Sequence, residues 1–333
     1  MLNELTALKE LLNPKQQFLI VAHKSPDGDA IGSGVAFYWL LKNLGLEAEL
    51  CFPDPPSESI LPFASSCPVI YFSEAPESAR EVFTHASVLI CLDFNGPSRV
   101  GEMQPLIDGF TGVKVMIDHH PNPESFADIM ISDVANSSTC QLIFECIEGM
   151  GLTQAIDQQV AKALYLGMLT DTGSFRFPSV TPKTHEIIAF LMKTGIHHWQ
   201  IHQDVFDNNR LEQLQLKGFA ISEKLTLLID KGLPFGFIAL TKEDLVKYNY
   251  RTGDTEGLVN TILSIEGIKA AVLIQERELG IKMSFRSKDE VYVNDLAKQH
   301  FNGGGHKYAA GGVSFDNMEV TISKLLSLIP ILF

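Results

Sequence analysis

The first part of the chain alternates short apolar runs with stretches of helical periodicity. Four apolar runs predict strands: "FLIVAH" (18–23), "AELCF" (48–52), "SVLICLDF" (87–94) and "KVMIDHH" (114–120). Helical spacing of apolar residues predicts helices at about 29–44, 137–150 and 155–170. Strands that alternate with helices indicate an α/β fold built on a parallel sheet.

The pattern changes twice further along the chain. From about 183 to 224 it becomes helical and polar, in "THEIIAFLMKTG" and "NNRLEQLQLKGFAISEKL". From about 225 the runs "LTLLID", "FGFIAL", "KAAVLIQER" and "GIKMSFRS" predict strands, followed by a helix, "VNDLAKQHF", and by "NGGGHKYAAGG". We therefore expect a parallel-sheet domain at 1–190, a helical connector at 191–224 and a smaller α/β domain at 225–333.

Composition narrows the class of protein. The 333 residues are 45% hydrophobic, enough for two ordinary cores, and the longest apolar runs are too short to span a bilayer. The five cysteines form no C-x-x-C pair and lie mostly in apolar segments, which favours reduced thiols and a cytoplasmic location. A net charge of −14 argues against binding of long duplex nucleic acid. Residues 281–312 carry a net charge of +2 (five basic, three acidic), which indicates a small anionic ligand.

Three of the first four predicted strands end in side chains that can bind metals. The first runs into His23, Asp27 and Asp29, the third ends at Asp93, and the fourth ends at Asp118, His119 and His120. Because ligands of an open parallel sheet bind beyond the carboxyl ends of its strands, we expect these side chains to converge on one edge. Asp171 follows an apolar helix in "LGMLTDTG", where a turn could bring it to the same edge.

Crowded carboxylates repel one another, and divalent cations remove that conflict. A mixed Asp/His set suits Mn²⁺ or a similar ion with open positions, whereas structural zinc would favour cysteine. The donors exceed what one ion needs, so the pattern predicts two ions that share a carboxylate and activate water against a phosphate. Any one of these acids could instead cap a helix or form a turn. Their joint placement at three strand ends favours the metal site.

These motifs, taken in order, resemble those of the DHH phosphoesterases. The resemblance rests on "HKSPDGDAIGS", Asp93, "DHH" at 118–120 and "TDTGSF" at 170–175, while "FNGGGHKYAAGG" (301–312) resembles the signature of the associated DHHA1 domain. It covers essentially the whole chain. It implies a phosphoric ester hydrolase that uses two Mn²⁺ ions, with Mg²⁺ or Co²⁺ as possible replacements.

The resemblance also implies roles for individual residues. His23 and Asp27 would bind one ion, Asp29, His119 and Asp171 would bind the other, and Asp93 would bridge both. His120 would contact the scissile phosphate or assist the leaving group, and Asp118 would orient a histidine. Gly28 is expected to let the chain turn tightly between the two acids beside it.

In the second domain the resemblance implies a phosphate-binding site. Its residues would be Gly303, Gly304, Gly305 and His306, with Arg286 as a bidentate clamp. "NGGGH" is not a Rossmann fingerprint, because it follows a predicted helix, and it could also be only a glycine-rich turn. Arg99, which follows Asp93 by six residues, is a further candidate for a phosphate contact or a solvated turn residue.

Within the family, a two-domain chain of this size resembles the members that hydrolyse short oligonucleotides (nano-RNA) to mononucleotides and 3′-phosphoadenosine 5′-phosphate (pAp) to AMP. The alternatives are a cyclic- or linear-dinucleotide phosphodiesterase, a RecJ-like single-strand exonuclease and a non-catalytic nucleotide-binding module. Family analogy allows a homodimer, and we expect no membrane partner.

For two other motifs we favour a structural role over a functional one. His198 and His202 have the i, i+4 spacing of helical zinc ligands, but "HHWQIH" lacks the glutamate of a metalloprotease. We expect them to pack on a helix surface. Phe175 and Phe177 could stack on a base, but core packing is expected for at least one of them.

Overall fold

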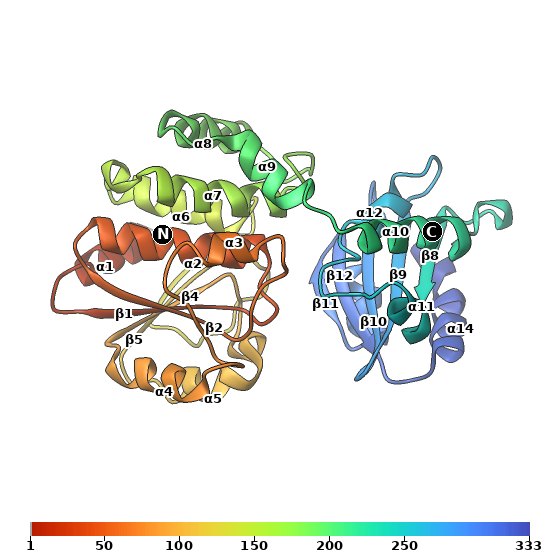
Figure 1. The fold of residues 1–333 in the computed structure, drawn as a ribbon, viewed down its shortest axis with the longest axis horizontal. Helices are drawn as coiled ribbons and strands as arrows, with labels where there is room; N and C mark the ends of the chain where they lie inside the picture. The colour runs from red at the N-terminus through yellow and green to blue at the C-terminus, as the bar shows by residue number, and fades with distance from the viewer. Residues whose placement is uncertain (1) are drawn as a thin grey trace. The chain divides into compact units, whose positions relative to one another are not determined.

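The computed structural model describes residues 2–333 and divides the chain into two compact units (Figure 1). The first unit ends at Asn208 and the second is Asn209–Phe333. The division falls inside the predicted connector, so that part of the expected helical segment belongs to each unit. The predicted domain limits at 190 and 224 stay predictions.

The first unit contains a six-stranded sheet whose strands all run parallel. Its strands are β1 (Gln17–Ala22), β2 (Glu47–Phe52), β3 (Ile70–Tyr71), β4 (Val88–Leu92), β5 (Val113–Asp118) and β6 (Ile129–Ser132). The order β3-β2-β1-β4-β5-β6 reverses direction between β1 and β4, which creates the crevice where open α/β sheets bind ligands. The predicted parallel α/β fold is confirmed.

Helices cover both faces of this sheet (Figure 1). They are α1 (Leu2–Leu11), α2 (Gly28–Asn43), α3 (Leu61–Ala64), α4 (Pro76–His85), α5 (Gln104–Asp108), α6 (Thr139–Gly149), α7 (Gln158–Asp171), α8 (Pro182–Lys193) and α9 (His198–Phe206), with 3₁₀ turns η1 (Pro97–Met103) and η2 (Thr153–Ala155). A hydrophobic core lies on each face of the sheet, and alternate residues of β1 point into one or the other. Ile20 packs with α2, α6 and α7, and Val21 packs with α4 and α5. Strands buried on both faces explain the continuous apolar runs in the sequence.

The second unit contains a mixed six-stranded sheet of order β11-β12-β10-β9-β8-β7. Its strands are β7 (Leu225–Leu227), β8 (Phe235–Leu240), β9 (Ala270–Arg277), β10 (Gly280–Ser287), β11 (Gly304–His306) and β12 (Ala309–Ser314). Only β8 and β9 pair in parallel among the strand pairs of residues 225–314. The glycine-rich motif, for which a turn was one interpretation, contains the edge strand β11.

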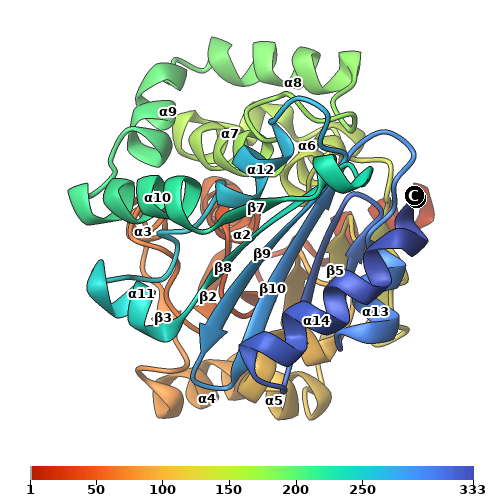
Figure 2. The same cartoon turned by 90° about the vertical axis from the view of Figure 1, so that its right-hand side faces the viewer.

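Helices also cover the second sheet (Figure 2). They are α10 (Leu211–Glu223), α11 (Lys242–Lys247), α12 (Leu258–Leu263), α13 (Asn294–His300) and α14 (Met318–Leu328), with 3₁₀ turns η3 (Ile229–Lys231) and η4 (Ile329–Leu332). In β9, Val272 packs in the core with α13 and α14, while Leu273 packs in the core with α10, α11 and α12. The smaller α/β domain predicted from the sequence is confirmed as a fold.

The structure bears on the cysteines and on the helices that could span a membrane. All five cysteines are free and buried, as their apolar surroundings in the sequence predict. Burial raises the pKa of Cys51, Cys67 and Cys146 to about 12, so these thiols are poor nucleophiles near neutral pH. Among residues 2–333, none of the helices has both the length and the apolar character needed to cross a membrane.

Candidate metal centre

The predicted site residues of the first unit meet at the carboxyl ends of β1, β4 and β5. His23 and Asp93 each directly follow a strand, and Asp118 is the last residue of β5. Five of the predicted residues are buried: His23, Asp29, Asp93, Asp118 and His119. The reversal of strand order between β1 and β4 therefore brings together His23 and His119, which are 96 residues apart in sequence.

One group consists of His23, Asp27 and Asp93, whose ligand atoms lie within 4.8 Å of one another. His23 Nε2 lies 3.4 Å from Asp93 Oδ2 and 3.8 Å from Asp27 Oδ1. Asp27 also caps α2, because its Oδ1 accepts hydrogen bonds from the backbone N–H groups of Asp29 and Ala30. The carboxylate of Asp27 is about half exposed (54%), which makes it the open side of this group.

A second group consists of Asp29, His119 and Asp171, the last residue of α7. His119 Nε2 lies 3.3 Å from Asp171 Oδ2 and 3.9 Å from Asp29 Oδ2. The same nitrogen lies 3.8 Å from Asp93 Oδ1. Asp93 thus stands between the two groups, with one carboxylate oxygen toward His23 and the other toward His119.

A third group joins Asp93 to Asp118 and His120. His120 Nδ1 lies 2.7 Å from Asp118 Oδ1 and 3.7 Å from Asp93 Oδ1. The buried carboxylate of Asp118 therefore fixes the tautomer in which Nδ1 of His120 carries a proton. The other oxygen of Asp118, Oδ2, is buried and has no hydrogen-bond partner among residues 2–333.

Asp93 occupies a backbone conformation that few non-glycine residues adopt. Its φ is +64°, and its N–H donates to the carbonyl of Ile117 at 3.1 Å. Aspartate tolerates the left-handed region better than most residues, at a small cost in backbone energy. Strain of this kind at the end of a central strand is typical of a functional position.

Crowding of acids and imidazoles shifts the pKa values of the site. Burial, reinforced by the neighbouring charge of Asp93, raises the pKa of Asp29 to about 7. Burial and the charge of Asp29 likewise raise the pKa of Asp171 well above its usual range. Burial opposes the ionisation of Asp93 as well, but the hydrogen bond from His23 and the nearby His120 outweigh it, so its pKa is lowered. Despite burial, the adjacent carboxylates raise the pKa values of His23, His119 and His120.

The donor set fits divalent cations. It consists of carboxylate oxygens and imidazole nitrogens grouped in threes. Asp93 belongs to the first and third groups and lies 3.8 Å from His119 of the second. One buried carboxylate oxygen lacks a hydrogen bond within the part of the chain that the structure describes. A cation in each of the first two groups would neutralise acids that otherwise resist ionisation together. Oxygen and imidazole donors without thiolate suit Mn²⁺ or Mg²⁺ better than a structural zinc.

The N-terminus of α6 forms a part of the site that the sequence analysis missed. The backbone N–H groups of Thr139 and Cys140 donate to the two oxygens of Asp29, at 2.6 and 3.0 Å. The hydroxyl of Thr139 donates to Asp93 Oδ1 at 2.8 Å. The unpaired N–H groups and the dipole at a helix start stabilise carboxylates, so α6 holds Asp29 and Asp93 in place. In the sequence, "SSTC" (137–140) predicts a helix N-cap but gives no sign of contact with Asp29 or Asp93.

Two glycines make room for these side chains. Gly28 begins α2 with no positive φ, so its backbone conformation does not itself require glycine. Its Cβ would instead lie 2.4 Å from the hydroxyl of Thr170, the residue before Asp171. At Gly167 in α7, a Cβ would lie 2.2 Å from the sulfur of Cys140 and 2.4 Å from Asp29 Oδ1. Close packing of α2 and α7, and the space for the Asp29 carboxylate, therefore require glycine.

The predicted phosphate-binding residues of the second unit lie on the edge hairpin and its neighbour. Arg286 on β10 and His306 on β11 each pair with Ala309 of β12. Two of the three glycines have a packing role. A Cβ would lie 1.9 Å from the carbonyl of Gly311 at Gly303 and 2.5 Å from that of Ala309 at Gly305, whereas at Gly304 it would meet nothing within 4 Å.

The remaining sequence candidates have different surroundings. Arg99, in η1, is exposed, and its carbonyl accepts a 2.8 Å hydrogen bond from the N–H of Lys24, beside His23. His202 Nε2 lies 3.1 Å from the hydroxyl of Tyr165, and Phe175 packs on the same tyrosine at 5.6 Å between ring centroids. These contacts support packing for His202 and Phe175.

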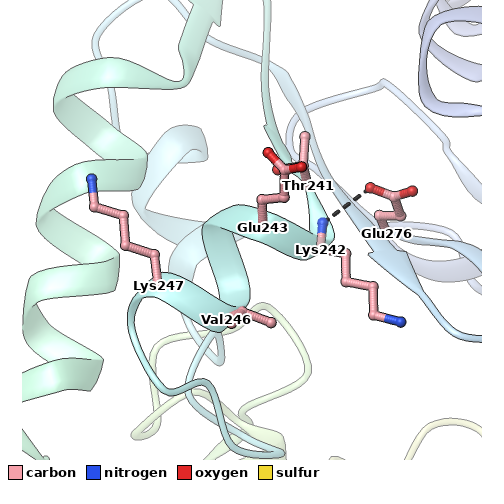
Figure 3. A pocket seen from close by; sticks show the side chains of 6 residues that line it. All are labelled: Thr241, Lys242, Glu243, Val246, Lys247 and Glu276. Atoms are coloured by element: carbon pink, nitrogen blue, oxygen red, sulfur yellow. Dashed lines mark hydrogen bonds between the residues drawn. The ribbon is translucent and has the colours of Figure 1, made fainter.

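A separate depression lies at the start of α11 in the second unit (Figure 3). It is lined by Thr241, Lys242, Glu243, Val246, Lys247 and Glu276. The N–H of Lys242 donates to Glu276 at 3.0 Å. It is an open surface feature with mixed charges and contains none of the predicted site residues.

Two domain families match this chain. The "DHH family, N-terminal domain" matches residues 17–168, and the "DHHA1 domain" matches residues 237–329. The chain belongs to the DHH/DHHA1 family, and it is a DHH-family phosphoesterase.

Relatives of the whole chain carry a more particular description. The chain is 28% identical to the bifunctional oligoribonuclease and PAP phosphatase NrnA of Bacillus subtilis, with 97% of this chain and 98% of that protein covered. It is 30% identical to the NrnA of Thermus thermophilus, with 88% and 82% covered. The crystal structure of an exopolyphosphatase-related protein from Bacteroides fragilis has a TM-score of 0.93 and 33% identity, covering 100% of this chain and 98% of that one.

Proposed function

We propose that this protein is a Mn²⁺-dependent phosphohydrolase that hydrolyses short oligonucleotides to mononucleotides and pAp to AMP. The observation that carries the proposal is the buried set of acids and histidines around Asp93, which has the donors for two cations. The similarity to NrnA over nearly the full length of the chain supports the substrate class. A cytoplasmic location and a homodimer stay predictions.

In this proposal the two groups each hold one cation. His23 and Asp27 would hold the first, Asp29, His119 and Asp171 would hold the second, and Asp93 would serve both. When bound, the cations supply Lewis-acid stabilisation of the phosphate oxygens and lower the pKa of a water molecule that attacks phosphorus. Mg²⁺ or Co²⁺ could take the same positions.

The chain's own groups would position the substrate and handle the proton. His120 carries a proton on Nδ1, where Asp118 holds it at 2.7 Å, so Nε2 is the atom that would give a proton to the leaving oxygen. Asp118 and Asp93 raise the pKa of His120 against the effect of burial, which favours the protonated form of the imidazole. Asp118 thus acts by orienting and charging His120.

In the second unit, we propose that Arg286, His306 and the open backbone at Gly304 bind the terminal phosphate of the substrate. The guanidinium of Arg286 donates to its neighbour's carbonyl at 2.9 Å, which limits its rotation. Gly303 and Gly305 would contribute by allowing the strand to approach β12 closely. Arg99 is a further phosphate contact in this proposal. A site for one terminal phosphate favours short substrates.

The test is a substrate panel with the full-length protein and Mn²⁺. Labelled RNAs of two to about 24 residues, pAp and a cyclic dinucleotide are incubated with and without a chelator. We expect chelator-sensitive release of mononucleotide that becomes slower with RNA length, and phosphate release from pAp. Processive loss from long strands would indicate a RecJ-like exonuclease instead. Cleavage confined to the cyclic dinucleotide would indicate that class of phosphodiesterase, and tight binding without hydrolysis would indicate a binding module.

A further inference from the structure

We propose that Tyr292 and Tyr308 form a stacking surface for a nucleobase of the substrate. This inference rests on the proposed function, because it takes the ligand to be a nucleotide. Both side chains stay at the surface, with 43% of Tyr292 and 37% of Tyr308 exposed. Their ring centroids are 5.6 Å apart, and the ring planes are inclined by 59°. Lys307 places its Nζ 5.2 Å from the centroid of Tyr292.

The backbone holds these rings in a defined place. Tyr308 lies in the two-residue turn between β11 and β12. Its carbonyl accepts a hydrogen bond from the N–H of Ser287, at the end of β10, at 3.0 Å. The carbonyl of Lys307 accepts another from the N–H of Val293, next to Tyr292, at 2.9 Å. The turn is thus tied to two neighbouring segments, and a ligand would bind a preorganised surface.

The tyrosines lie beside the residues proposed to bind phosphate. Arg286 and His306 both pair directly with Ala309, on either side of β12. Opposed residues of antiparallel strands point to the same face, so these two side chains share a face with Ala309 between them. Tyr308 precedes Ala309 in the chain. The turn therefore lies one residue along the chain from the position that Arg286 and His306 flank, within the span of one nucleotide.

The two exposed tyrosine rings lie next to each other at the surface, unlike the buried pair Phe285 and Phe301, whose ring centroids are 5.7 Å apart. Two neighbouring tyrosines held at the surface leave apolar area in water, which costs free energy in the absence of a ligand. Stacking on a base recovers that area, and it tolerates any base because every base has a π face.

The test compares AMP with ribose 5-phosphate by calorimetry on the full-length, Mn²⁺-loaded protein. The two ligands share the phosphate and the ribose and differ only in the base. We expect the wild-type protein to bind AMP roughly tenfold more tightly. Tyr308→Leu and Tyr292→Leu should each remove most of that preference and leave the affinity for ribose 5-phosphate unchanged. Tyr308→Phe, which keeps the ring, should preserve it.

The matched control is Phe315→Leu, which alters an exposed aromatic residue (77%) just after the opposite end of β12. It should change neither affinity. Equal binding of the two ligands by the wild-type protein, binding of neither, or equal weakening of both in the tyrosine variants would overturn the proposal. A preference for AMP without hydrolysis of any oligonucleotide would preserve the stacking site and reject the proposed function. Hydrolysis of oligonucleotides without a preference for AMP would support the proposed function and reject the stacking site.

Discussion

The two sheets of this protein differ in whether the polar groups of their candidate sites are buried or exposed. The first buries three aspartates, Asp29, Asp93 and Asp118, at the ends of parallel strands. The second leaves Gly304 exposed on the edge strand β11 and Arg286 half-buried on β10, with β12 between them. Buried acids need a compensating charge, whereas an exposed backbone can bind an anion without that cost. The comparison supports our proposal that the first unit cleaves the bond and the second binds the substrate.

The largest effect is expected from Asp93→Asn, because the carboxylate of Asp93 lies between the two candidate metal groups, 3.4 Å from His23 and 3.8 Å from His119. Asparagine also tolerates the φ of +64°, so the backbone should be retained. We expect turnover of a dinucleotide to fall by about 1,000-fold or more, equivalent to about 4 kcal/mol. The control is Asp108→Asn, an exposed acid on α5. Wild-type turnover by Asp93→Asn would refute the assignment of cleavage to this site.

Gly167→Ala tests the space around Asp29. The new methyl would overlap the sulfur of Cys140 and Asp29 Oδ1, so the carboxylate must shift. We expect the affinity for Mn²⁺, measured by calorimetry, to fall roughly 10- to 100-fold. Gly218→Ala in α10, where a Cβ meets nothing within 4 Å, is the control. Alanine has a higher helix propensity than glycine. A Gly167→Ala protein that is more stable and binds Mn²⁺ with unchanged affinity would show that the packing argument is wrong.

Thr139→Val tests the contribution of α6. The substitution keeps the shape and the N–H bond to Asp29 but removes the 2.8 Å hydrogen bond to Asp93. We expect about a tenfold loss of Mn²⁺ affinity. Thr139→Ser should restore the affinity because it restores the hydroxyl. Equal affinities in all three proteins would show that the hydroxyl does not position Asp93.

Gly304→Ala tests the second unit. A Cβ there meets open space, so the fold should be unaffected while the approach of a phosphate is hindered. We expect the KM for pAp to rise about fivefold with little change in kcat. Gly303→Ala, whose methyl would collide with the carbonyl of Gly311, should instead destabilise the hairpin. An unchanged KM in Gly304→Ala would indicate that substrate binds elsewhere.

The smallest effect concerns pH and the metal-free protein. The raised pKa values of Asp29, His23 and His119 mean that the folded state holds protons more tightly than the unfolded chain. The stability they contribute is present at low pH and is lost as the pH rises through their folded pKa values, which for Asp29 is about 7. We expect the Tm, measured calorimetrically, to fall by about 2–4 °C between pH 6 and pH 8.

Excess Mn²⁺ should remove this loss at pH 8, because the cation requires the deprotonated ligands and replaces the protons. The lowered pKa of Asp93 acts in the opposite direction, and only below about pH 4, where its unfolded form takes up a proton. A Tm of the metal-free protein that rises from pH 6 to pH 8 would contradict this account of the buried acids.

The sequence by itself determined the parallel sheet and the edge at which its acids gather. Apolar runs marked β1, β2, β4 and β5, and the residues that follow those strands contained most of the candidate ligands. These features are local, because the periodicity and the ends of a strand are determined by consecutive residues. The short edge strands β3 and β6 were missed, since two and four residues carry little periodicity.

Only the tertiary structure decided what supports the ligands. Thr139 and Gly167 act on Asp29 or Asp93 from helices that lie far away in sequence, and no local pattern distinguishes a cap threonine or a helical glycine that does so. The strand β11 likewise exists because it pairs with β12, although glycine disfavours strands. Most candidate ligands follow strand ends in the sequence, whereas their arrangement depends on which helices pack against those ends.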